Sequence, residues 1–129
     1  MAAGSYAKPV DNSGAGEEAR AISWRITMDF TLSDQQQAFV DMAADFAAEE
    51  LAPFALEWDQ TKHFPIDTLK KAGGLGLGAI CVADDVGGSG LGRLDTALII
   101  EALAIGCPTV AAYISIHNMC ATMIDRYGT

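Results

Sequence analysis

Few side chains of this sequence belong to types that can carry catalysis, and their spacing keeps those few apart. Ser115 and His117 supply a hydroxyl nucleophile and a base, but residues two apart on a helix lie on different faces and cannot pair directly. Asp84 and Asp85 supply two carboxylates, yet adjacent residues in a loop point apart and face water. These residues therefore predict no complete active site, and no catalytic residue is assigned.

The cysteines give no sign of a disulfide or a metal site. Cys81, Cys107 and Cys120 are odd in number and widely spaced, with no CxxC pair. This pattern predicts a reducing compartment, with each thiol acting as a small buried hydrophobe. His117 and Cys120 stand three apart, which is half of a metal site. Because zinc needs three or four convergent ligands, no metal site is predicted.

Two glycine-dense segments, residues 73–78 and 87–92, raise the question of nucleotide binding. Neither segment fits GxGxxG, and the sequence contains no Gly-Lys-Ser/Thr. A dinucleotide-binding turn also needs flanking parallel strands, which the pattern does not indicate. These glycines are instead predicted to allow positive φ angles and close approach between helix ends.

Apolar residues at helical spacing predict the elements that must position these side chains. Ser33 and Gln36 form the S-x-x-Q capping box of a first helix, and Pro53 breaks that helix near Ala52. A short helix follows over residues 54–59. One stripe of the first helix is predicted to face a core: Phe39, Met42, Ala43, Phe46 and Ala47.

Proline and glycine delimit the remaining helices. A short helix is predicted over residues 64–72, residues 75–82 fit neither helix nor strand, and residues 83–90 are predicted as a loop. Residues 93–105 are apolar on several faces, which predicts a helix buried on more than one side. A last helix is predicted over residues 108–127. The predicted fold is an all-α bundle of five or six helices.

Length and composition exclude two classes of partner. A chain of 129 residues suffices for one domain, and half of its residues are hydrophobic. No run reaches the ~18 uncharged apolar residues of a membrane span, so the hydrophobic surplus is expected to pack against something outside the chain. The whole net charge of −9 falls on Met28 and the residues after it, and such an acidic surface repels nucleic acid.

Residues 1–27 are small and polar, with no apolar stripe, which predicts a disordered N-terminal extension. Met28 directly precedes the first patterned segment and is a hypothetical natural start. The extension has no hydrophobic segment of a secretory signal, and its three acids argue against a mitochondrial presequence. Together with the cysteine pattern, this predicts a cytoplasmic location.

A series of short motifs occurs along residues 28–129 in a fixed order. They are DFTL at 29–32, FAAEELAP at 46–53, EWD at 57–59, FP at 64–65, GLG at 74–76 and VGGSGL at 86–91. In this order they resemble the N-terminal helical domain of the acyl-CoA dehydrogenases. Three further segments are similar to the branch of that family that oxidises isobutyryl-CoA in valine breakdown: RLDT at 93–96, AIGC at 104–107 and AYISIHNMC at 112–120.

The resemblance implies FAD-dependent dehydrogenation between the α and β carbons of a short branched acyl-CoA. In that family a glutamate removes the α-proton, the flavin accepts the β-hydride, and electrons leave to electron-transfer flavoprotein. The family's middle β-domain, its C-terminal helical domain, its catalytic glutamate and most of its FAD contacts are expected beyond Thr129. No cofactor-binding residue is therefore assigned, and this chain is expected to be inactive alone and to belong to a homo-oligomer.

By position, the resemblance implies that Ala111 and Ser115 contribute to the floor of the acyl cavity. Their small side chains leave room for a branched acyl group, and ordinary packing between helices is the alternative. A stand-alone helical interaction module without catalytic activity is the alternative for the whole chain. Residues 93–105 and the last helix are expected to expose apolar surface, so the chain alone is expected to self-associate or to be partly molten.

An acyl-CoA-binding protein is a third reading, and the small number of basic residues argues against it. A CoA phosphate favours cationic side chains. From Met28 onward the basic residues are Lys62, Lys70, Lys71, Arg93 and Arg126.

Overall fold

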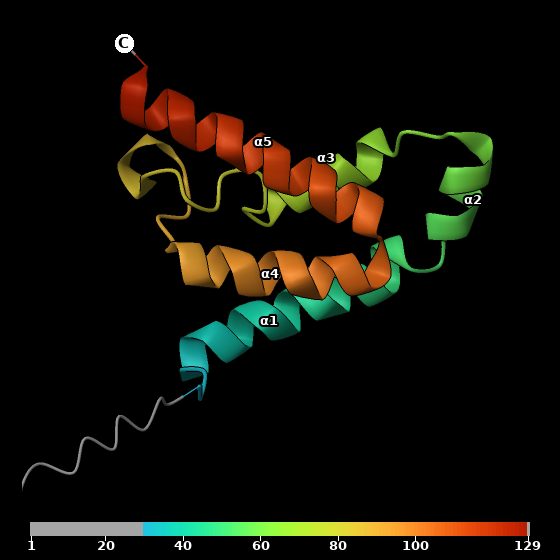
Figure 1. Cartoon of the computed structure of the whole chain (residues 1–129), viewed down its shortest axis with the longest axis horizontal. Coiled ribbons are helices and arrows are strands. Elements are labelled where there is room, and N and C mark those ends of the chain that lie inside the picture. The colour runs from blue at the N-terminus through green and yellow to red at the C-terminus, as the bar shows by residue number, and fades with distance from the viewer. Residues whose placement is uncertain (1–29, 129) are drawn as a thin grey trace, which may run out of the picture. The chain divides into compact units, whose positions relative to one another are not determined.

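The structure is a computed structural model that describes residues 30–128, of which residues 31–128 belong to one compact unit. The described part contains only helices and turns, so the all-α prediction is confirmed (Figure 1). The expected disorder of residues 1–27 and the start at Met28 lie outside the described residues. The elements are α1 (Asp34–Phe46), the π-helical turn η2 (Ala47–Leu51), α2 (Ala55–Thr61), α3 (Ile66–Gly74), the 3₁₀ turn η3 (Asp84–Val86), α4 (Arg93–Gly106) and α5 (Pro108–Tyr127).

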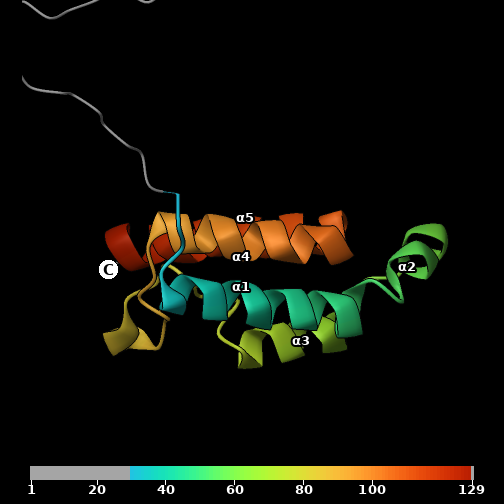
Figure 2. The same ribbon diagram turned by 90° about the horizontal axis from the view of Figure 1, so that it is seen from below.

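The long helices pack around α4, which contacts α1 on one side and α5 on another. Seen from below, α4 and α5 form one layer and α1 and α3 form the other, while α2 lies beyond the ends of the long helices (Figure 2). The apolar pattern of residues 93–105 thus corresponds to a helix with two packing partners. Leu94 and Ile105 nevertheless remain 61% and 85% exposed, so part of the apolar surface of α4 has no cover within the described chain.

The start of α1 follows the sequence pattern closely. The Ser33 hydroxyl accepts a hydrogen bond from the Gln36 backbone N–H (3.2 Å), and the Gln36 side-chain oxygen accepts one from the Ser33 N–H (3.1 Å). The predicted capping box is therefore confirmed. The helix does not stop at Phe46 but continues through η2, in which the Ala52 N–H donates to the Ala47 carbonyl (2.8 Å). The predicted break before Pro53 follows this turn.

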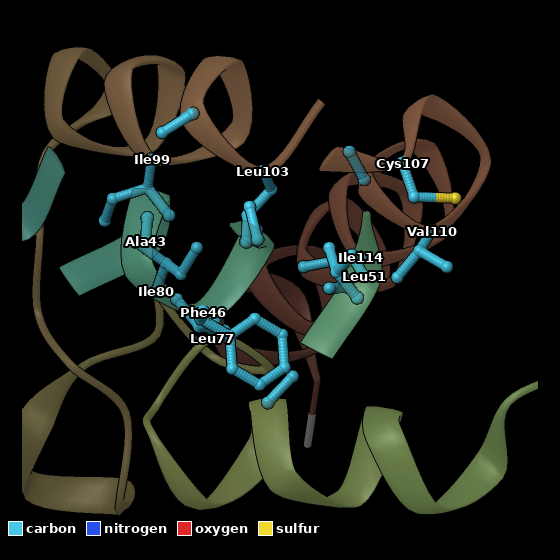
Figure 3. Packing of buried hydrophobic residues seen from close by; sticks show 14 residues of the cluster. Ala43, Phe46, Leu51, Leu77, Ile80, Ile99, Leu103, Cys107, Val110 and Ile114 are labelled. Carbon is cyan, nitrogen blue, oxygen red and sulfur yellow. The ribbon is translucent and has the colours of Figure 1, made fainter. Parts of the chain in front are cut away.

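A single hydrophobic core joins the helices (Figure 3). The predicted stripe of α1 supplies Ala43 and Phe46 as buried residues, with Phe39 and Met42 packed at the edge. The largest fully buried side chains of this core come from three segments, so removing any one of these segments would open the core. They are Leu51 of η2, Leu77 and Ile80 of the segment after α3, and Ile99 and Leu103 of α4.

Residues 75–82, which the pattern left unassigned, contribute to the core without forming a helix or a strand. Their backbone bonds to the glycine-rich loop instead: the Ser89 N–H donates to the Ala79 carbonyl (2.9 Å) and the Leu91 N–H to the Ile80 carbonyl (2.9 Å). A buried backbone needs such partners. This irregular segment therefore stays ordered beneath α5.

Two glycines show two structural roles that glycine has in this fold. Gly87 ends η3 with a φ of +94°, a conformation that L side chains rarely adopt. Gly106 ends α4 directly against η2, where an added Cβ would lie 2.6 Å from the Ala47 carbonyl oxygen. Positive φ was predicted for the glycine-dense segments and occurs at Gly87, whereas Gly106, which shows the close approach between helices, lies outside those segments.

Candidate functional site

The residue predicted to face a ligand, Ser115, lines an open cavity of 430 Å³, which we call the Ser115 cavity. It lies between the first turn of α4 and the second half of α5. Its lining consists of Cys81 from the irregular segment, Arg93 and Thr96 from α4, and Ser115, Asn118, Met119, Thr122, Met123, Arg126 and Tyr127 from α5.

Helical spacing explains why α5 contributes most of this lining. Ser115, Met119 and Met123 follow one another at intervals of four residues, so they form a row along one face of the helix. Met119 and Met123 are both exposed. The row therefore presents one hydroxyl and two flexible thioethers, a surface suited to a small apolar group with a polar end.

Hydrogen bonds fix the inner wall of the cavity. The Thr96 hydroxyl donates to the Gly92 carbonyl (2.9 Å) and lies 2.8 Å from the Cys81 sulfur. Asn118 is 4% exposed, and its amide nitrogen donates to the Leu77 carbonyl (2.7 Å). These polar groups are engaged with the protein, so their hydrogen bonds are already made within the chain.

The structure separates the two residues predicted for the acyl floor. Ala111 is 1% exposed and belongs to the core, whereas Ser115 is exposed and lines the cavity. At 3.6 residues per turn, positions four apart are offset by about 40° around the helix, which is enough to place one at a core boundary and the other outside it. Their role toward an acyl group stays a prediction.

The remaining sequence candidates are scattered. His117 is exposed on another side of α5 and lines a 280 Å³ cavity next to α3. Asp84 and Asp85 lie exposed in η3. Among residues 30–128, no group of three or more His, Cys, Asp or Glu side chains is placed to hold a metal ion. None of these residues therefore joins Ser115 in a site.

The cysteines require a correction. Cys107 is buried as predicted, but Cys120 is exposed and Cys81 is only partly buried. The prediction of three buried thiols was wrong because it took burial from residue type alone, whereas Cys120 lies on the outer face of α5.

A search of the described helices for a membrane-spanning segment finds none that combines the required length with the required hydropathy.

Sequence reasoning missed an aromatic cavity at the other end of α5. It measures 480 Å³, lies between α2 and α5, and includes Trp58, Phe64 and Tyr113 in its lining. Phe64 and Tyr113 meet edge to face with their ring centroids 4.9 Å apart. The aromatic residues are spread along the sequence and only the fold gathers them, so spacing gave no signal.

A family model and curated relatives both match this chain to the same protein family. The family model described as acyl-CoA dehydrogenase, N-terminal domain, matches residues 33–129. The chain is 55% identical over 98 residues to a Bos taurus protein named isobutyryl-CoA dehydrogenase, mitochondrial, which covers 76% of this chain and 24% of that protein. A Dictyostelium discoideum protein of the same name is 54% identical with the same coverage.

A more distant relative shows the same partial coverage. A Clostridium acetobutylicum protein named acyl-CoA dehydrogenase, short-chain specific, is 35% identical over 103 residues, which is 79% of this chain and 27% of that protein. The chain thus spans about a quarter of the length of the curated relatives it matches.

Proposed function

The chain belongs to the acyl-CoA dehydrogenase family and corresponds to its N-terminal domain, and on that premise we propose that it forms one wall of the substrate cavity in a dehydrogenase of short branched acyl-CoA. Identity supports the choice of acyl group. It is 55% and 54% to the two relatives named for isobutyryl-CoA and 35% to the relative named for short chains. The reaction is dehydrogenation between the α and β carbons.

The observation that carries this proposal is Ser115 on the wall of an open 430 Å³ cavity. A branched acyl group is wide close to its thioester. A small side chain on the cavity wall leaves room for this width, whereas a bulky side chain would not. Met119 and Met123 continue the wall and adapt to an apolar ligand. We assign Ala111 a supporting role, because its place in the core fixes the turn of α5 that carries Ser115.

The family generally uses FAD, and the residues described here do not fit it. The two glycine-dense segments form the end of α3 and the turns that follow α3 and η3, and neither offers a phosphate-binding loop. We therefore place the flavin contacts and the catalytic base in parts of a longer protein. In that arrangement residues 28–129 are the N-terminal domain and residues 1–27 are an extension.

The exposed apolar residues of α4 and α5 support an assembly larger than this chain. Leu94, Ile105, Ile116 and Ile124 are each more than half exposed, and a packed domain would cover them. We propose a homo-oligomer that passes electrons to electron-transfer flavoprotein. We place it in the cytoplasm, because its three free cysteines suit a reducing compartment. Cell fractionation tests this, and recovery in mitochondria, as the names of two relatives indicate for those proteins, would contradict it.

The test is substitution of Ser115 in the longer enzyme encoded by the native reading frame. Ser115→Leu fills the cavity wall, so kcat/KM for isobutyryl-CoA should fall about tenfold or more relative to n-butyryl-CoA. Cys120→Leu is the matched control, since it adds bulk to an exposed position of α5 outside this cavity. An equal loss for both substrates, or the same effect from Cys120→Leu, would refute the wall assignment.

The 129-residue chain provides a second test. Purified alone, it should bind no flavin and should not oxidise isobutyryl-CoA with a dye acceptor. Turnover by this chain would overturn the proposal, because the base would then have to lie among the residues described here.

A stand-alone interaction module is the second candidate, and the exposed apolar face of α5 favours it. The mass of the native protein distinguishes the two. A native product several times longer than 129 residues supports the dehydrogenase, and one that ends at Thr129 supports the module.

A further inference from the structure

The basic residues of the described chain divide into paired and free groups. Lys70 lies 3.4 Å from Asp67, and Lys71 lies 2.7 Å from Glu50. Arg93 and Arg126 have neither an ion-pair nor a hydrogen-bond partner among residues 30–128, and Lys62 has no ion pair there either. Arg93 and Arg126 are the two arginines of residues 30–128, and neither guanidinium group is neutralised there although the net charge of the chain is −9. The location of these two unpaired side chains therefore bears on ligand binding.

Both free arginines line the same cavity. Arg93 is the first residue of α4, and Arg126 is in the last turn of α5. The two helices are joined only by Cys107 and run in opposite directions, so the start of α4 and the end of α5 lie at the same end of the pair (Figure 1). The fold thus brings two cations from distant positions in the sequence into the lining of the Ser115 cavity, one from each helix.

The acids next to these arginines in the sequence are bound elsewhere. Asp95 accepts hydrogen bonds from the Gln36 side chain and from the Gly92 N–H, both at 3.0 Å. Asp125 accepts one from the Ala83 N–H at 3.3 Å. Neither carboxylate forms an ion pair with Arg93 or Arg126. The guanidinium donors therefore remain available to a ligand.

We propose that Arg93 and Arg126 form an anion subsite in the Ser115 cavity that binds a phosphate group. A carboxylate has two oxygens in one plane, which suit a single guanidinium fork. Two guanidinium groups from different helices favour a tetrahedral anion, whose oxygens point in several directions. The Ser115 hydroxyl lines the same cavity and adds a neutral donor. Because the acidic chain repels polyanions, the phosphate belongs to a small molecule.

The test is a titration of the 129-residue chain with inorganic phosphate at constant ionic strength, followed by ¹H–¹⁵N NMR. Saturable shifts are expected in the first turn of α4 and the last turn of α5. Arg93→Gln and Arg126→Gln should each weaken binding about tenfold, because each removes charged hydrogen bonds. Lys62→Gln is the matched control: Lys62 lines the aromatic cavity and not this one, so binding should not change.

Three results would overturn the proposal. The first is the absence of saturation, and the second is equal phosphate affinity in the wild type and in both arginine variants. The third is acetate binding as tightly as phosphate, which would assign the pair to a carboxylate. Both arginines are exposed, so the circular dichroism melts of the variants should match the wild type. The titration needs neither flavin nor turnover, so its failure is distinct from failure of the Ser115→Leu experiment.

Discussion

The Asn118 side-chain oxygen accepts a hydrogen bond from the backbone N–H of Ile80, with the two atoms 2.7 Å apart. The amide nitrogen of the same residue donates to the Leu77 carbonyl (2.7 Å) and to the Ile114 carbonyl (2.9 Å). One buried amide thus satisfies an irregular segment that has no sheet or helix partners of its own. This contact holds the inner wall of the Ser115 cavity against α5.

Asn118→Ala should therefore lower the free energy of unfolding by about 3 kcal/mol, because it leaves a buried N–H and a buried carbonyl without partners. Urea unfolding followed by circular dichroism measures the change. His117→Ala, at the exposed neighbouring position, should stay within about 0.5 kcal/mol of the wild type. Equal unfolding midpoints for Asn118→Ala and the wild type would show that water replaces the lost amide.

Gly106→Ala should destabilise the chain by about 1–3 kcal/mol. The new Cβ would lie 2.6 Å from the Ala47 carbonyl oxygen and 2.9 Å from the Ala47 Cβ, and a backbone atom cannot move aside as a flexible side chain can. Gly73→Ala is the control, since nothing lies within 4 Å of its added Cβ and alanine favours a helix. The thermal midpoint should fall for the first variant and hold or rise for the second; the reverse order would reject the close contact between α4 and η2.

Asp95 links the starts of two helices, and Asp95→Ala should cost about 1–2 kcal/mol. Its carboxylate binds the Gln36 side chain of α1 and the Gly92 N–H that precedes α4, so both contacts are lost together. Asp67→Ala removes only an exposed ion pair with Lys70 and should have little effect. Chemical denaturation distinguishes the two. Equal effects would mean that the Gln36–Asp95 bond adds nothing to stability.

The exposed apolar face of α5 should make the 129-residue chain self-associate. Ile116 and Ile124 are 59% and 71% exposed, and burying them between two copies removes apolar surface from water. Sedimentation velocity should show a mass that grows with concentration, and the double variant Ile116→Gln, Ile124→Gln should reduce it. Leu56→Gln, on α2, should not. A chain that stays monomeric and melts sharply would contradict this expectation.

The sequence predicts the helices of this fold well, because the signals are local. Ser33, Pro53 and Pro108 mark helix boundaries through hydrogen-bond and ring geometry that needs no tertiary context. The order of residues 75–82 could not be predicted, since it depends on Asn118 far along the chain.

The same limit applies to the candidate site. Ser115 was placed by a family resemblance, whereas the convergence of Arg93 and Arg126 depends on the crossing of two helices, which no local pattern encodes. The different surroundings of Ala111 and Ser115 likewise follow from how α5 is rotated against the core. Helical spacing alone could not fix that rotation.

Cys107 is the single residue between α4 and α5, so its backbone conformation sets the angle between the two helices. Cys107 is buried, and its backbone has φ −155° and ψ 102°. The Ser115 cavity lies near the ends of α4 and α5 that are remote from Cys107. The 14 residues of α4 correspond to about 20 Å of helix. A change of about 5° in the angle between α4 and α5 at Cys107 would therefore move Arg93 by about 2 Å relative to Arg126. The backbone geometry at Cys107 therefore sets the distance between the two guanidinium groups, although Cys107 lies at the opposite end of the helix pair.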